Sequence, residues 1–181
     1  MANRVSDKLT EVHDRIYCCR SGSAADTQAI TGMVYGALQQ HAVDLGRLPK
    51  VATAAHLFRQ PCYQHKDKLS AGIIVAGWDE VEGGQVYCIP MGGTLHRQAF
   101  SIGGSGSTYI YGHCDAAYKP GMTLEECKDF VKTALSLAMG RDGSSGGVIR
   151  MVSINKEGVT REFTPGNKLP YMDSNEGQYL T

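Results

Sequence analysis

The sequence predicts an α+β fold in which helices cover antiparallel sheets. One strand pattern comes first, two helical patterns follow, then come a run of strand patterns, two more helical patterns and a final pair of strand patterns. This grouping favours antiparallel sheets over a doubly wound parallel fold, in which strands and helices alternate. The 181 residues show no internal repeat and no linker-like segment, so we expect a single domain over residues 1–181.

The first part of the chain predicts one strand and two helices. Residues 15–20 are a short run with β-branched and aromatic side chains that ends at a Ser-Gly turn signal, which is typical of a strand. Ser23 can cap a helix that runs to about Leu45, because apolar residues recur there at helical spacing. A second helix is expected over about 49–67, although Pro61 should kink it or end it early.

In the middle of the chain the pattern changes to short apolar runs separated by glycines. The runs 73–76, 85–90 and 97–102 have strand length and predict an antiparallel meander. Residues 105–118 are then expected to be helical.

The last third predicts one more helix and a hairpin. Thr123 can cap a helix whose apolar stripe we expect in the core, formed by Leu124, Cys127, Phe130, Val131, Ala134, Leu135 and Ala138. Two strands over 148–155 and 159–164 follow, joined by a short turn. A polar tail from about residue 171 ends the chain.

The composition excludes several classes of function. Eighteen Lys and Arg residues balance eighteen Asp and Glu residues, so we expect neither nucleic-acid nor membrane partners. The longest apolar stretch, 71–78, is far shorter than the roughly 20 residues of a membrane span, and residues 1–15 are too charged for a secretory signal. These features predict a cytoplasmic and nuclear protein. Six cysteines without a C-x-x-C pair and six histidines without metal-ligand spacing predict no metal site and no cofactor.

Two glycine-rich loops are the candidate sites. Residues 103–107 could bind a phosphate at a helix start, but the lysine of a phosphate loop and the acidic residue of a dinucleotide fingerprint are absent. A tight turn is therefore the favoured interpretation. Residues 142–147 lie between a helix and a strand, where loops often carry function, although Asp and Ser also serve turn hydrogen bonds.

Four motifs in order indicate a family. They are NRVSDKL at 3–9, RSGSAAD at 20–26, GGSGSTYIYG at 103–112 and RDGSSGG at 141–147. In this order they resemble the beta-type subunits of the 20S proteasome core, and the similarity continues through 76–87 and 116–127. The resemblance implies a four-layer αββα sandwich, the amino-terminal nucleophile hydrolase fold, here with its first strands missing.

The resemblance also implies threonine-type peptide hydrolysis, in which the hydroxyl of an amino-terminal threonine attacks the peptide carbonyl and its own amine can act as base. Lys8 matches the lysine beside that nucleophile, and Asp142 matches the carboxylate that orients the lysine. Ser105 and Ser145 match the serines of the surrounding polar network. Gly22 matches the residue whose backbone N–H faces the developing oxyanion. The alternative roles are a surface charge for Lys8 and turn formation for the others.

Arg20 matches the base of the pocket that receives the side chain preceding the scissile bond. A guanidinium there would favour Asp or Glu through a charge-assisted contact, which points to the constitutive caspase-like, beta-1 type branch. The alternative is a strand-end arginine in a surface ion pair.

The start of the chain departs from the family pattern. Members begin with threonine and run through two strands before the segment that matches Asn3, whereas here Met1 and Ala2 lead directly into it. On the order of 20 or more residues are therefore expected to be absent, which leaves the chain as written without its nucleophile and inactive. An amidase with another amino-terminal nucleophile is excluded, because Met1 and Ala2 provide no reactive side chain.

Two interpretations of function remain. The first is a beta subunit of the core, in a stacked-ring particle with other alpha-type and beta-type subunits, that acts on peptide substrates in ATP- and ubiquitin-dependent protein degradation. The second is an inactive ring component or truncated paralogue with a structural role only.

Overall fold

A computed structural model describes residues 7–169, which cluster into two compact units. The first unit contains 7–104 and 152–161, and the second contains 105–151 and 162–169. The predicted single domain stays a prediction, and the predicted polar tail lies outside the described residues. No helix within 7–169 is both long and apolar enough to cross a membrane.

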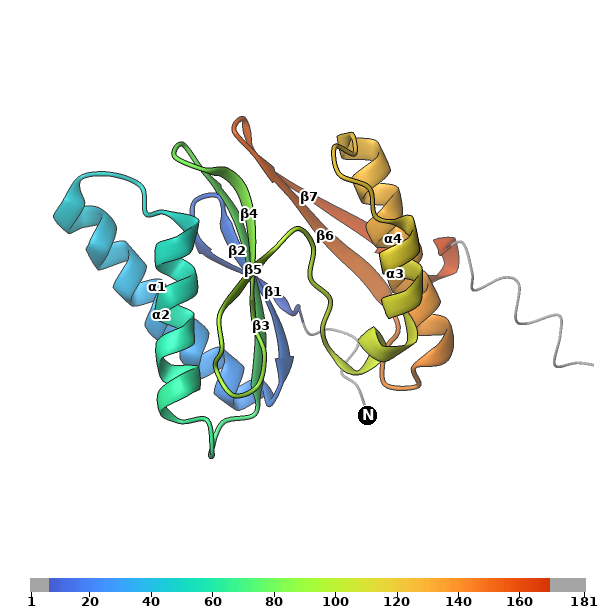
Figure 1. Cartoon of the computed structure of the whole chain (residues 1–181), viewed down its shortest axis with the longest axis horizontal. Coiled ribbons are helices and arrows are strands. Elements are labelled where there is room, and N and C mark those ends of the chain that lie inside the picture. Colours follow the sequence, from blue (N-terminus) through green and yellow to red (C-terminus); the bar gives the residue numbers. More distant parts are fainter. Residues whose placement is uncertain (1–6, 170–181) are drawn as a thin grey trace, which may run out of the picture. The chain divides into compact units, whose positions relative to one another are not determined.

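The first unit is built on a five-stranded antiparallel meander with strand order β1-β2-β3-β4-β5. Helices α1 and α2 cover one face of this sheet (Figure 1). The elements are β1 (Leu9–His13), β2 (Ile16–Gly22), α1 (Ala24–Leu45), α2 (Val51–Gln64), β3 (Ala71–Asp79), β4 (Gly83–Ile89) and β5 (His96–Gln98). The predicted α+β class with antiparallel sheets is confirmed.

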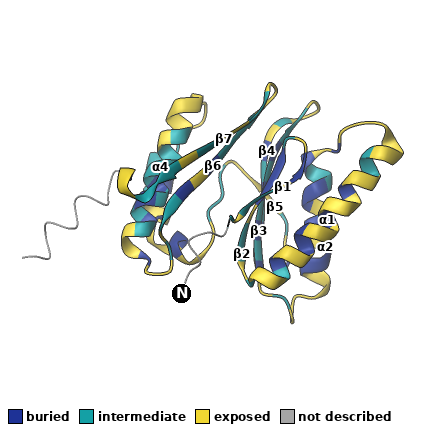
Figure 2. Cartoon of the chain, turned by 180° about the vertical axis from the view of Figure 1, so that it is seen from behind, coloured by how far each residue is buried: buried dark blue, intermediate teal, exposed yellow. Residues whose placement is uncertain are grey.

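The core of the first unit lies between the sheet and its two helices. Burial alternates along β3, where Ala71, Ile73 and Val75 are buried and the residues between them are partly exposed. This is the period of two that a strand with one covered face requires. Leu38 of α1 and Phe58 of α2 are fully buried against the same cluster, and both helices expose their outer faces (Figure 2).

The ends of α1 agree with the prediction. The Ser23 hydroxyl accepts the Asp26 N–H at 3.3 Å, and Gly46 ends the helix in the left-handed conformation at φ 60°. Helix α2 is shorter at both ends than the predicted 49–67, and it continues through Pro61 for three residues. Pro61 is buried, so tertiary packing holds this last turn despite the lost backbone hydrogen bond.

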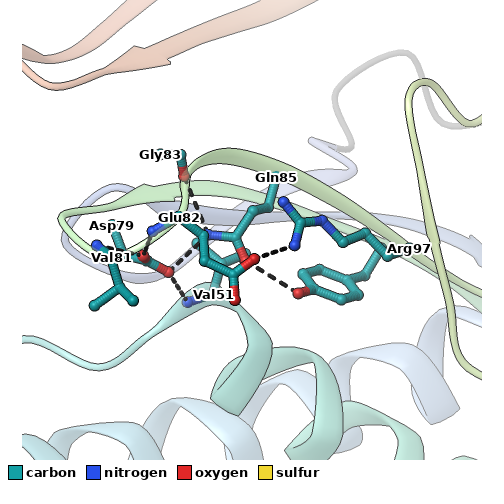
Figure 3. Close-up of polar contacts among 8 residues, drawn as sticks. Val51, Asp79, Val81, Glu82, Gly83, Gln85 and Arg97 are labelled. Carbon is teal, nitrogen blue, oxygen red and sulfur yellow. Dashed lines mark hydrogen bonds and ion pairs between the residues drawn. The ribbon is translucent and has the colours of Figure 1, made fainter.

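A carboxylate on β3 caps the first turn of α2 (Figure 3). Asp79 accepts the N–H of Val51 at 3.0 Å, the side-chain amide of Gln85 at 2.7 Å, and the backbone N–H groups of Val81 and Glu82 at 3.0 and 2.9 Å. Burial alone would raise the pKa of Asp79, but these hydrogen bonds outweigh it and the pKa is lowered. Asp79 thus joins α2 to the β3–β4 turn.

Two strands of the meander differ from the prediction. Strand β1, which pairs with β2 from Leu9 to His13, was not predicted from the sequence. A register shift between Glu11 and His13 interrupts its alternation, so the periodic signal of a strand is weak there. Strand β5 is shorter than the expected 97–102, and among the described strands it pairs with β4 at the edge of the sheet.

The second unit contains helices and the base of a hairpin. Its elements are the 3-10 turn η1 (Ser105–Tyr109), α3 (Tyr111–Ala117), α4 (Leu124–Arg141) and the 3-10 turn η2 (Gly166–Lys168). The strands β6 (Val148–Asn155) and β7 (Gly158–Pro165) form a two-stranded sheet whose residues 152–161 cluster with the first unit.

Helix α4 packs on this hairpin. Ile149, Met151 and Leu169 are buried against the partly buried Val131 and Leu135. The predicted cap at Thr123 is confirmed as a capping box, in which Thr123 and Glu126 bond each other's backbone N–H groups. The predicted apolar stripe is wrong at its first positions, because Leu124 and Cys127 are exposed. They lie in the first turn of the helix.

Candidate functional site

The six predicted site residues fall into two groups of three. Lys8, Arg20 and Gly22 belong to the first unit, and Ser105, Asp142 and Ser145 belong to the second. Within the first unit, pairing of strands β1 and β2 brings Lys8 close to Arg20, 12 positions later in the chain. Within the second unit, Ser105 and Ser145 are 40 positions apart and both bond Asp142.

Asp142 is the centre of the group in the second unit. Its Oδ2 atom accepts hydrogen bonds from the hydroxyls of Ser105, at 2.7 Å, and of Ser145. Its Oδ1 atom accepts the backbone N–H of Ser144 at 3.0 Å. Asp142 is only 7% exposed. The structure thus brings all three predicted residues of this unit into one hydrogen-bonded cluster, which we call the Asp142 cluster.

Local structure holds this cluster in place. Asp142 is the C-cap of α4 and donates its N–H to the carbonyl of Ala138 at 2.8 Å, while Ser145 N–H donates to the Asp142 carbonyl at 3.0 Å. Ser105 begins η1. Because both hydroxyl protons point at the carboxylate, the two serine oxygens keep lone pairs that can accept a further donor, such as an amine.

Gly106 lies against the Asp142 cluster and was not among the site residues predicted from the sequence. A Cβ at this position would lie 3.0 Å from the Ser145 Oγ atom, 3.2 Å from the Asp142 Oδ2 atom and 3.2 Å from the Ala138 Cβ atom. A Cβ here would pack tightly against these atoms, so a glycine lets η1 approach the Asp142 cluster without displacing them. The glycines on both sides of Ser105 were the available signal, but a turn explains them equally well.

Arg20 lies on β2 and is tied to the residues before β1 and to α1. Its Nη2 donates to the carbonyl of Asp7 at 3.0 Å, and its Nη1 donates to the hydroxyl of Thr27 at 3.4 Å. Its backbone N–H donates to the carbonyl of Lys8 at 3.1 Å. The Nε atom is buried and has no hydrogen-bond partner among the described residues.

The Arg20 side chain borders a shallow pocket of about 340 Å³. The pocket is lined by Thr10, Glu11, Arg20, Gln28, Thr31, Gly32 and Tyr35. These residues come from β1, β2 and α1, so one wall is a sheet edge and the other is a helix. A fixed guanidinium at such a pocket can pair with a carboxylate.

Lys8 and Gly22 flank Arg20 on the sheet. Lys8 is exposed immediately before β1. Gly22 ends β2 with φ +96°, and a Cβ there would collide with the carbonyl oxygen of Ser70. A side chain is therefore excluded both by conformation and by space.

The described residues contain no group of three His, Cys, Asp or Glu side chains that could hold a metal ion. The predicted site residues offer two hydroxyls, a buried carboxylate, a lysine and an arginine.

Comparisons with known proteins agree with the motifs. A family model described as "Proteasome subunit" matches residues 1–154. The chain is 59% identical over 170 residues to "Proteasome subunit beta type-6" of Dictyostelium discoideum, covering 94% of this chain and 79% of that relative. It is 56% identical over 163 residues to "Probable proteasome subunit beta type-1" of Schizosaccharomyces pombe, covering 90% and 72%. It is also 54% identical over 170 residues to "Proteasome subunit beta type-9" of Homo sapiens, covering 94% and 77%.

Proposed function

Because the chain belongs to the proteasome subunit family and is similar to its beta-type members, we propose that it supports threonine-type hydrolysis of peptides after acidic residues. Family membership gives it a role in the proteasome core and implies assembly with other proteasome subunits. We further propose that the particle is a stack of rings and that it takes part in ATP- and ubiquitin-dependent degradation. All six cysteines are free, which suits a reducing compartment such as the cytoplasm or nucleus.

The observation that carries the acidic preference is the fixed Arg20 guanidinium beside the pocket. Asp7 and Thr27 hold two of its nitrogens, and its Nε donor is buried without a partner among the described residues. A substrate carboxylate at this pocket would gain a charge-assisted contact worth about 1.5 to 3 kcal/mol, which corresponds to a preference on the order of 10- to 100-fold over a neutral side chain. We assign Arg20 the role of selecting Asp or Glu before the scissile bond.

The Asp142 cluster supports the catalytic part of the proposal. The hydroxyls of Ser105 and Ser145 can accept hydrogen bonds from the α-amino group of an amino-terminal threonine, which has to be held near its own hydroxyl to act as base. Lys8 contributes a positive charge that favours the deprotonated forms of neighbouring groups. Gly22 offers a backbone N–H to the oxyanion, at a position where a side chain is excluded.

The test of the acidic preference is the variant Arg20→Leu in assembled particles that carry a family-type amino-terminal threonine. We expect kcat/KM for a fluorogenic peptide with Glu before the scissile bond to fall about 10- to 100-fold, and that for a Leu peptide to rise. Arg59→Leu, which removes the same charge from the exposed face of α2, is the control and should leave both peptides unchanged. An unchanged acidic preference in Arg20→Leu would refute the assignment.

The alternative is a ring component without activity. A subunit whose mature form lacks an amino-terminal threonine should hydrolyse no peptide and should not react with covalent inhibitors that require the threonine. Intact mass and amino-terminal sequencing of the subunit isolated from particles decide between the two functions. An amino-terminal threonine supports the protease, and Met1 or Ala2 at the start supports the structural role.

A further inference from the structure

We propose that Asp7 is a positioning residue for Arg20, and that it sets the preference for acidic substrates without touching them. This inference rests on the proposed function. Among residues 7–169, the Arg20 guanidinium has two acceptors, the Thr27 hydroxyl and the Asp7 carbonyl. The two acceptors differ in how they are held.

The Thr27 hydroxyl is fixed by its helix. Thr27 is 2% exposed, and its Oγ1 atom donates to the carbonyl of Ser23 at 2.9 Å in the first turn of α1. Its lone pairs therefore point to Arg20 from a rigid element. The Asp7 carbonyl lies two residues before the first residue of β1, outside regular secondary structure. Its direction has to be fixed by something other than the strand ladder.

The Asp7 side chain supplies that constraint. Its Oδ1 atom accepts the backbone N–H of Leu9 at 2.9 Å, which closes a turn over residues 7–9. Its Oδ2 atom lies 3.9 Å from the Nη1 atom of Arg161, whose guanidinium lies 5.4 Å from the centre of the Tyr17 ring. The hydrogen bond from the Leu9 N–H to the Asp7 carboxylate restricts the backbone angles at Asp7. The ion pair with Arg161 is partly solvent-exposed and adds a weaker constraint.

Loss of this turn should therefore weaken the hydrogen bond between the Asp7 carbonyl and the Arg20 guanidinium. Preorganised charge contributes to binding and catalysis only while it stays within a fraction of an ångström of its productive place. We expect about a 3- to 10-fold loss of kcat/KM for acidic peptides from this loosening, smaller than the loss from removing Arg20 itself. Peptides with an apolar residue before the scissile bond should be affected much less.

The experiment compares Asp7→Ala, Asp7→Asn and Arg20→Leu in assembled particles that carry the amino-terminal threonine. Asn keeps a side-chain oxygen that can accept the Leu9 N–H, so Asp7→Asn should retain most of the acidic preference while Asp7→Ala loses it. Glu80→Ala is the matched control, because Glu80 also forms a surface ion pair, with Arg15 at 3.8 Å, in the same unit. It should leave the ratio of the two peptides unchanged.

The ratio of acidic to apolar kcat/KM separates positioning from general damage. If kcat/KM in Asp7→Ala falls equally for both peptides, or for neither, the ratio stays at its wild-type value and the inference is overturned. A loss of ratio in Asp7→Ala with recovery in Asp7→Asn would support it. If Arg20→Leu itself leaves the ratio unchanged, the proposed function fails, and this outcome is distinct because it does not depend on Asp7.

Discussion

The backbone N–H of Arg20 donates a hydrogen bond to the carbonyl oxygen of Lys8 across 3.1 Å. This bond continues the β1–β2 ladder, in which Leu9 is paired with Cys19. The register of one hairpin therefore sets the spacing between the lysine assigned to catalysis and the arginine assigned to specificity. A slip of one residue would turn every side chain of the strand to the opposite face.

Replacing Gly22 should destabilise the protein. Gly22→Ala places a Cβ at φ +96° against the Ser70 carbonyl, so we expect a loss of about 2 kcal/mol or more in the free energy of unfolding. Gly32→Ala is the matched control. A Cβ at Gly32 would meet no described atom within 4 Å inside α1, and this change should stabilise by roughly 0.5 to 1 kcal/mol. Urea unfolding of the purified chain measures both, and equal effects of the two substitutions would contradict the account.

Removing the Asp142 carboxylate should loosen the loop at 142–147. Asp142→Ala leaves the hydroxyls of Ser105 and Ser145 without their acceptor, at a cost of about 1 to 3 kcal/mol in local stability. Hydrogen exchange of the loop amides should accelerate roughly 5-fold or more in particles. Ser144→Ala is the control, since Ser144 contributes its backbone N–H to the Asp142 cluster. Unchanged exchange in Asp142→Ala would show that the cluster does not hold the loop.

Asp79 should stabilise the first unit in a pH-dependent way. Asp79→Ala removes the acceptor of four N–H groups and the cap of α2, which we expect to cost about 2 to 3 kcal/mol in the free energy of unfolding. The folded-state pKa of Asp79 is lowered, so its contribution is complete above the unfolded pKa of about 4 and is lost as the pH falls through the folded pKa.

Unfolding curves at several pH values check this dependence. The difference in stability between the wild type and Asp79→Asn should be constant above about pH 5 and shrink below about pH 4. Glu80 is an exposed neighbour of Asp79, and the variant Glu80→Gln should show the same dependence of stability on pH as the wild type. A difference that grows on acidification would have the wrong sign for a lowered pKa.

Cys18 should resist alkylation in the folded protein. Burial raises the pKa of the Cys18 thiol to about 11, and its side chain has no exposed surface. At pH 8 only about 0.1% of this thiol is thiolate, and the reagent cannot reach it. Exposed Cys127 on α4 should be labelled by iodoacetamide much faster than Cys18, as read by peptide mass spectrometry. If Cys18 is labelled as fast as Cys127 in the folded protein, Cys18 does not lie in the core. In urea, where the chain is unfolded, the two thiols should react at similar rates.

Much of the fold could be predicted from local signals. Ser23 and Thr123 carry short polar side chains directly before apolar periodic segments, and both prove to be helix caps. Strand β1 could not be predicted in this way, because its charge and its register shift hide the alternation, and its pairing with β2 is what makes it a strand. The continuation of α2 past Pro61 is likewise a result of packing, which compensates a local penalty.

By itself the sequence determined the family, through ordered motifs that also named Lys8, Arg20, Gly22, Ser105, Asp142 and Ser145. Only the tertiary structure decided which groups surround Arg20, Gly22 and Asp142. It showed that two hydroxyls converge on one carboxylate oxygen, that η1 brings Gly106 close to this oxygen, and that the guanidinium of Arg20 donates a hydrogen bond to the Asp7 carbonyl. The physical reason is range. Caps, turns and periodicity act between residues a few positions apart, whereas hydrogen bonds across 13 or 37 residues exist only after the chain has packed.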